Sequence, residues 1–216
     1  MNYTLIRSKR KTLAVRILPG GIVEVRAPLR LSKLQIEQFL QQKADWIEAN
    51  LMLSPPIPQH LGEGVRLPFL GTEYSLRLRE NLPAGIYDGK LILPLSPFAN
   101  DAEIRKAAEN FYRQQAKLYI PPLIAQFSHK LGVECKGIRI TGAKTRWGSC
   151  SAKSSLNFSW RLMAAPLASI EFVAAHELCH LLHFDHSAAF YSALAGILPD
   201  WKARHDTLKQ FRQLCW

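Results

Sequence analysis

The stretch VAAHELCHLLHFDHS, residues 173–187, decides how the second half of this chain is interpreted. It places His176 and His180 four residues apart in a largely apolar segment. On an α-helix, residues four apart lie on one face, one turn from each other. Both imidazoles can therefore direct a ring nitrogen to one zinc ion, at roughly 2.0–2.1 Å. We predict a buried helix that begins near Pro166, ends at about Leu182 and carries a metal site.

Glu177 follows the first histidine of this segment and can project toward a water molecule on the metal. A carboxylate in that position can take a proton from the water and return it to the leaving group. Zinc lowers the pKa of its water to about 7, so that hydroxide is available at neutral pH. A buried polar network without a metal is the alternative, but it leaves these polar side chains costly to bury. We therefore predict a zinc-dependent hydrolase with Glu177 as its catalytic base.

Catalytic zinc sites usually take three protein ligands. The candidates for the third ligand are His183, Asp185, His186, Glu171 and His205. His183 would be rotated away from the line between His176 and His180, whereas His186 follows a predicted helix break at which the chain can turn back. We favour His186, so that the predicted metal ligands are His176, His180 and His186. Ser187 is predicted to cap the next helix.

The spacing from His180 to His186 is also that of metzincin proteases. The glycine that metzincins use at the turn is replaced here by His183. Their later Met-turn is missing, because the three methionines, at positions 1, 52 and 163, all precede the site. We therefore predict three histidine ligands but do not assign the chain to the metzincins.

Residues 1–98 are predicted to form a β-rich region with one helix. Apolar residues alternate over 13–17 and 23–27, on either side of Pro19-Gly20-Gly21, which is typical of a β-hairpin. Ser32 and Gln35 match a capping box and predict the start of a helix with an apolar stripe from Ile36 to Leu51. The prolines in residues 55–58 are predicted to form a stiff linker.

Residues 99–216 are predicted to form the catalytic domain. Helices are expected over 102–119 and 121–131, separated at Pro121-Pro122. A strand is expected at 138–140, a hairpin over 146–160, and two short helices over 187–198 and 199–214. The whole chain is therefore predicted to be an α+β protein with the metal site in its second part.

The composition is that of a soluble globular protein, with 48% hydrophobic and 21% charged residues among 216. No secretory signal or membrane span is recognised, so we expect a cytoplasmic protein that does not bind a membrane. The four cysteines form no C-x-x-C pair and are expected to be reduced thiols. The net charge of +11 suggests an anionic partner, either nucleic acid or a nucleotide. Much of this charge lies between Lys130 and Arg161, with seven basic residues and one acidic residue.

Three segments in order carry a family resemblance: Thr145–Ser151, Asn157–Leu162, and the histidine segment through Phe190. Together they resemble the YgjP-like metallopeptidase family, which is related to SprT-like zinc proteases. The resemblance implies a zincin-like core, in which a small sheet packs on the H-E-x-x-H helix. It also implies zinc ligands at His176, His180 and His186, and a general base at Glu177.

The resemblance further implies a peptide or protein as substrate. In zincin-like proteases an edge strand beside the active-site helix pairs with an extended peptide, and Trp147–Cys150 is the candidate strand here. Gly148 would allow a close backbone approach. Arg146 and Arg161 are either oxyanion-stabilising groups or surface cations, and for the side chains of Trp147 and Trp160 we favour core aromatics that seat the helix. We therefore assign none of these residues to the catalytic set.

Two other functions fit parts of the sequence. The basic run could bind phosphates in a metal-dependent nucleotide or phosphoanhydride hydrolase, although no G-x-x-x-x-G-K phosphate loop is present. A basic nucleic-acid-binding protein with a structural metal is the second alternative. Structural zinc sites usually have four protein ligands, and Cys179 is offset from the two histidines on the predicted helix.

Overall fold

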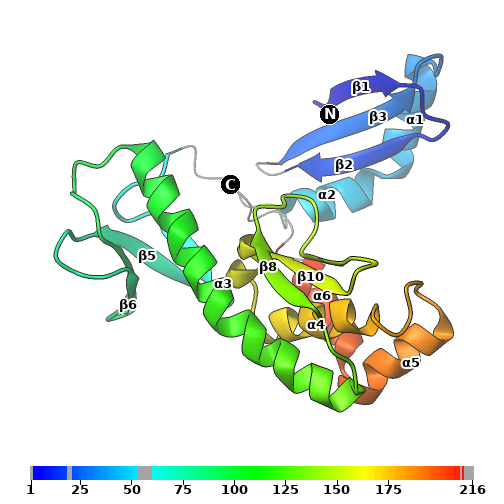
Figure 1. The fold of residues 1–216 in the computed structure, drawn as a ribbon. Coiled ribbons are helices and arrows are strands. Elements are labelled where there is room, and N and C mark those ends of the chain that lie inside the picture. Colours follow the sequence, from blue (N-terminus) through cyan, green and yellow to red (C-terminus); the bar gives the residue numbers. More distant parts are fainter. Residues whose placement is uncertain (1, 19–20, 53–59, 210, 212–216) are drawn as a thin grey trace. The chain divides into compact units, whose positions relative to one another are not determined.

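The computed structural model describes residues 2–18, 21–52, 60–209 and 211 of the chain (Figure 1). These residues are a mixture of helices and small sheets, as an α+β fold requires. The contacts divide the described residues into two compact units, one up to residue 52 and the other over residues 60–211. We describe each unit by itself. Among the described residues, no helix combines the length and the apolar character needed to cross a membrane.

The first unit contains a three-stranded sheet of order β1-β3-β2, formed by Thr4–Ser8, Ala14–Leu18 and Ile22–Pro28. Strand β2 pairs antiparallel with β3, as the predicted hairpin requires. Residues 19 and 20 of its turn lie outside the described residues. Strand β1 runs parallel to β3 and was not predicted, because its residues are all exposed and show no apolar alternation.

Two helices of the first unit replace the single predicted one. Helix α1 covers Lys33–Gln42, and both hydrogen bonds of the predicted capping box between Ser32 and Gln35 are present. Helix α2 covers Ala44–Met52. The prediction of one continuous helix was wrong because Lys43 leaves the helical region, at φ −103° and ψ 10°. The change of direction lets residues of both helices join the core formed by β3, among them Ile36 and Ile47, which are fully buried.

The second unit begins with a four-stranded sheet of order β4-β5-β7-β6. Its strands are Arg66–Phe69, Thr72–Leu78, Gly85–Tyr87 and Lys90–Leu93. This sheet packs on the helix that follows it: the rings of Phe69 and Phe111 lie 5.3 Å apart, and the Tyr112 hydroxyl donates to the Pro68 carbonyl at 2.6 Å. The boundary predicted at residues 98 and 99 falls within this second unit and stays a prediction.

Helix α3, Asp101–Leu131, is the long helix of the second unit (Figure 1). The predicted break at Pro121-Pro122 was wrong, since both prolines lie inside one continuous helix. Each proline removes a backbone donor. Burial of Ile120, Ile124 and Phe127 on both sides of the prolines supplies the packing that holds the helix together.

The remaining elements surround the histidine segment. A three-stranded sheet of order β8-β10-β9 comprises Gly137–Thr141, Ser155–Ser159 and Gly148–Cys150. It leads through the short 3-10 helix η1, Trp160–Ala164, into α4, Leu167–Cys179. Helices α5, Ala188–Ile197, and α6, Trp201–Lys209, complete the unit. The predicted hairpin is the antiparallel pair β9–β10, and β9 forms an edge of its sheet.

Candidate metal centre

Helix α4 holds the first two residues of the candidate site in a largely buried setting. Pro166 precedes its first residue, where the missing backbone donor of proline costs nothing. The helix is apolar on nearly all sides, and its buried residues include Val173, Ala174 and Leu178. His176 and Glu177 therefore emerge from a body fixed by packing, and Glu177 is only 7% exposed.

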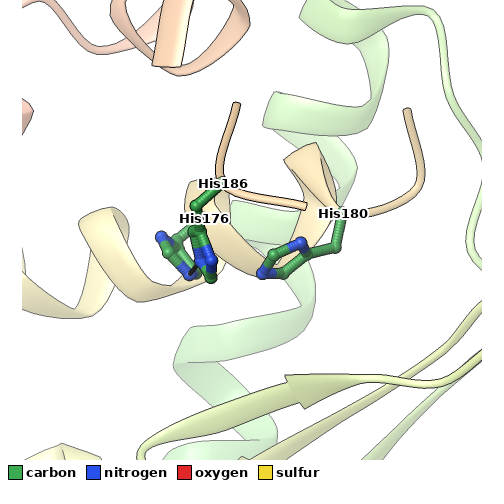
Figure 2. Close-up of side chains that lie close together, drawn as sticks. All are labelled: His176, His180 and His186. Atoms are coloured by element: carbon green, nitrogen blue, oxygen red, sulfur yellow. Dashed lines mark hydrogen bonds between the residues drawn. The ribbon is translucent and has the colours of Figure 1, made fainter. Parts of the chain in front are cut away.

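The side chains of His176, His180 and His186 converge (Figure 2). One ring nitrogen from each lies within 4.8 Å of the others. The Nε2 atoms of His176 and His186 are 3.2 Å apart. The structure thus brings together all three residues that were predicted as metal ligands.

The turn after α4 brings His186 back to the helix. The helix ends at Cys179, about one turn earlier than predicted, and His180 follows as its cap with helical backbone angles. Exposed His186 lies just before α5, which begins after Ser187. The Ser187 hydroxyl accepts the backbone N–H of Phe190 at 3.4 Å, which is the predicted cap.

The other candidates for the third ligand lie outside the cluster. His183 contributes its main chain: the His180 Nδ1 lies 3.1 Å from the His183 carbonyl oxygen, to which a protonated Nδ1 donates. That bond leaves the His180 Nε2 lone pair for a metal. Glu171 instead forms an ion pair with Arg204, and the Asp185 carboxylate accepts the Ser187 backbone N–H.

Phe190 forms an apolar wall beside all three histidines. Its ring centroid lies 5.0 Å from that of His176, 4.8 Å from His180 and 4.9 Å from His186. The side chain is fully buried at the start of α5. The family resemblance includes Phe190, but its contact with the three rings could not be predicted, because that contact depends on the turn that places α5 against α4.

Burial sets the protonation state of His176. It is the largest cause that lowers the pKa of His176 to about 4, and the neighbouring histidines lower it further. Burial also lowers the pKa of His180, against the opposing effect of its bond to the His183 carbonyl. His176 is therefore neutral at physiological pH, as a metal ligand must be. Among the described residues, the buried Nδ1 atom of His176 has no hydrogen-bond partner. Such buried unsatisfied groups are uncommon and call for an explanation, such as a functional role.

Glu177 lies against the edge strand β9. A Cβ atom on Gly148 would be 2.6 Å from both Cγ and Oε1 of Glu177, so only glycine permits this approach. Burial raises the pKa of Glu177 to about 7, while the charge of Arg146 and a hydrogen bond from the Cys150 backbone act to lower it. The sequence predicted a close approach at Gly148 but did not identify the Glu177 carboxylate as the neighbour.

An ion pair and aromatic packing fix α6 to the back of α4. Arg204 pairs with Glu171, and its Nε donates to Asp200 at 2.8 Å. The Trp201 ring stacks on Tyr191 at 5.0 Å and on Phe172 at 6.5 Å. The ring centroid of Tyr191 lies 6.2 Å from that of His186, and the ring centroid of Phe172 lies 5.6 Å from that of His176. Three helices therefore support the rings of the candidate ligands.

Comparison with known proteins identifies a family and a similar solved structure. A family model described as the YgjP-like metallopeptidase domain matches residues 11–211. The crystal structure of the metallopeptidase zymogen of Pyrococcus abyssi abylysin is similar over 41% of this chain and 90% of that one, with 20% identity and a TM-score of 0.39. No curated protein matches the chain.

Proposed function

The chain belongs to the YgjP-like metallopeptidase family, and from that membership we propose that it is a zinc-dependent peptidase with a zincin-like catalytic core. His176, His180 and His186 would hold the zinc ion, and Glu177 would act as general base. The observation that carries this proposal is the convergence of three imidazoles at helix α4, which also carries the buried carboxylate of Glu177.

The donor set fits zinc. Imidazole nitrogen is a preferred zinc ligand, and catalytic sites commonly use three protein ligands and leave one position for water. In a tetrahedral site with Zn–N bonds of roughly 2.0–2.1 Å, two ligand nitrogens lie about 3.3–3.4 Å apart. The His176 and His186 nitrogens, at 3.2 Å, are already close to that separation.

Zinc bound to these residues would supply a Lewis acid that lowers the pKa of a water molecule toward 7. Glu177 accepts the proton that the attacking water loses and delivers it to the nitrogen of the leaving amine. In the metal-free protein burial raises the pKa of Glu177 to about 7. Gly148 and the Cys150 backbone hold the carboxylate in place.

Strand β9 is the proposed site for the substrate backbone. An extended peptide can add to a sheet edge through main-chain hydrogen bonds, which do not require a particular sequence. Strand β9 is such an edge, and it touches the candidate base through Gly148. This arrangement supports the Trp147–Cys150 segment as the strand with which a substrate pairs.

The proposal is tested with purified protein loaded with one equivalent of zinc. Peptide libraries and unfolded proteins should be cleaved, and Glu177→Gln should abolish cleavage while the metal content stays at one. His186→Ala should lose zinc, whereas the matched control His183→Ala should keep it, because His183 contributes only its carbonyl.

A panel of nucleoside triphosphates, tested with zinc, manganese and magnesium, separates peptide from phosphoanhydride hydrolysis. Triphosphate hydrolysis without peptide cleavage would replace the peptidase by the nucleotide alternative. Cleavage that persists unchanged in Glu177→Gln would contradict the assigned base.

A further inference from the structure

Two exposed cations bracket the edge strand β9. Arg146 precedes the first residue of the strand, Gly148, by two positions, and Lys153 follows its last residue, Cys150, by three. Within the part of the chain that the structure describes, neither cation forms an ion pair. Each end of the strand therefore carries a cation that is not held in an ion pair with a described residue.

The sheet that contains β9 has no acidic residue. Between Glu134 and Glu171 the sequence contains no aspartate or glutamate. The same segment, which forms β8, β9, β10 and η1, contains six basic residues: Lys136, Arg139, Lys144, Arg146, Lys153 and Arg161. A solvated basic face is the ordinary outcome of such a run, but here the cations flank the strand that touches the candidate base.

The open edge of β9 faces that base. The Trp147 carbonyl accepts the Ser159 backbone N–H, and the Ser151 backbone N–H donates to Ser155, so residues 147 and 151 point toward β10. Main-chain groups alternate along an antiparallel pair, so those of Gly148 and Cys150 point away from β10. The hydrogen bond from the Cys150 backbone to Glu177 lies on this open side. A peptide that pairs with the main-chain groups of this edge that Glu177 leaves available would run beside Glu177, with Arg146 before the strand and Lys153 after it.

Arg146 also lies within electrostatic reach of the Glu177 carboxylate. The guanidinium is therefore within electrostatic reach of the position at which a substrate bond would be cleaved. A carboxylate on the substrate would meet this cation without displacing an internal ion pair.

We propose that the edge of β9 recognises acidic peptide segments, with aspartate or glutamate side chains on either side of the cleaved bond beside Arg146 and Lys153. This inference rests on the proposed peptidase function and adds the class of substrate. A strand edge pairs with a peptide backbone, which favours an acidic peptide over a nucleic acid as the anionic partner.

The test uses two peptide libraries on one scaffold that differ only in carrying Glu or Gln at the flanking positions. The zinc-loaded protein should cleave the Glu library with a higher kcat/KM, chiefly through a lower KM, and added salt should reduce the difference. Arg146→Gln and Lys153→Gln should each lower the Glu-to-Gln ratio by up to roughly fivefold, the range of an exposed ion pair. Arg139→Gln, on β8 at the opposite edge of the same sheet, should leave the ratio unchanged.

Binding of the same peptides to Glu177→Gln gives a readout that does not need turnover. Equal cleavage and binding of the two libraries, or the same ratio in Arg146→Gln and Arg139→Gln, would overturn the acidic preference and leave the peptidase standing. Tighter binding of the Glu peptides without cleavage by the zinc-loaded protein would support the recognition and reject the peptidase. Displacement of the bound Glu peptide by single-stranded DNA at lower concentration than by free Glu peptide would overturn the choice of a peptide.

Discussion

The backbone of Gly148 lies directly against the carboxylate of Glu177, at a distance that leaves no room for a side chain. This contact joins the edge strand β9 to helix α4. It fixes the candidate base from the side opposite to its own helix, and a hydrogen bond from Cys150 strengthens the attachment. The position of the base therefore depends on a residue nearly thirty positions earlier in the chain.

We expect Gly148→Ala to reduce kcat/KM by about 100-fold, because displacing a catalytic group by about 1 Å has an effect of that order. Zinc content should not change, since the histidines lie outside this contact. Gly137→Ala is the matched control: it lies in the same sheet, and an added Cβ there meets no atom within 4 Å. The measurement is the steady-state kcat/KM of the wild type, Gly148→Ala and Gly137→Ala. Wild-type kinetics for Gly148→Ala would show that the contact does not position the base.

Phe190→Leu should weaken zinc binding by about 10- to 100-fold, the usual effect of removing a group that orients metal ligands. Leucine keeps the site apolar but lacks the flat ring that contacts all three imidazoles. The dissociation constant is measured by competition with a chelator, and cobalt substitution reports the geometry through its absorption spectrum.

Phe111→Leu is the control for this change. Phe111 is equally buried but packs on Phe69 and Tyr112. It should lose a comparable amount of stability and keep the zinc affinity of the wild type. An equal loss of affinity in both variants would mean that Phe190 acts only through global stability.

Removing the carboxylate at Glu177 should stabilise the zinc-free protein at high pH. The pKa of Glu177 is about 7 in the folded state, against 4.5 ordinarily, so the folded protein binds more protons between these values. Stability is consequently lost as pH rises from about 4.5 to 7. Glu177→Gln should therefore gain up to about 3 kcal/mol at pH 8 and little at pH 4.5.

Urea unfolding of both proteins at several pH values, with zinc removed, measures this difference. The opposite effect of His176, whose lowered pKa costs stability on acidification below 6.5, is common to both proteins and cancels. A gain that does not vary with pH would assign the effect to packing rather than to charge.

Arg204→Lys should destabilise the protein by about 1–2 kcal/mol. The guanidinium contacts Glu171 and Asp200 at once and also reaches the Ala168 carbonyl, and lysine cannot reproduce that geometry. Arg66→Lys, which alters an exposed pair with Glu73 at 3.8 Å, should change stability by less than about 0.5 kcal/mol. Thermal melts of the two variants give the comparison, and similar shifts in both would contradict the role of Arg204 in fixing α6.

Local signals in the sequence predicted local structure well. Ser32 with Gln35 and Ser187 each mark a helix start, because a cap involves only residues three apart. Predictions of where helices end were less accurate. Lys43 ends α1 although the apolar stripe continues, and α3 passes through Pro121-Pro122 because buried residues on both sides outweigh two lost hydrogen bonds.

In the candidate site, too, local features were predicted and contacts between distant segments were not. The spacing of His176 and His180 is a property of one helix, so the sequence indicates it directly. The prediction of His186 depended on a turn after the helix, and the structure contains that turn. The contacts of Gly148 with Glu177, and of Phe190 with the three rings, join segments whose pairing depends on the whole second unit. No pattern within a single sequence identifies such neighbours.

The bond between His180 and His183 uses the main chain of the second residue. Any amino acid at position 183 can offer the same carbonyl oxygen, provided that the turn keeps its shape. The orientation of a candidate ligand is thus encoded in backbone geometry and leaves the side chain at 183 unconstrained. A search for this centre by residue identity at position 183 would therefore miss proteins in which another residue offers the same carbonyl.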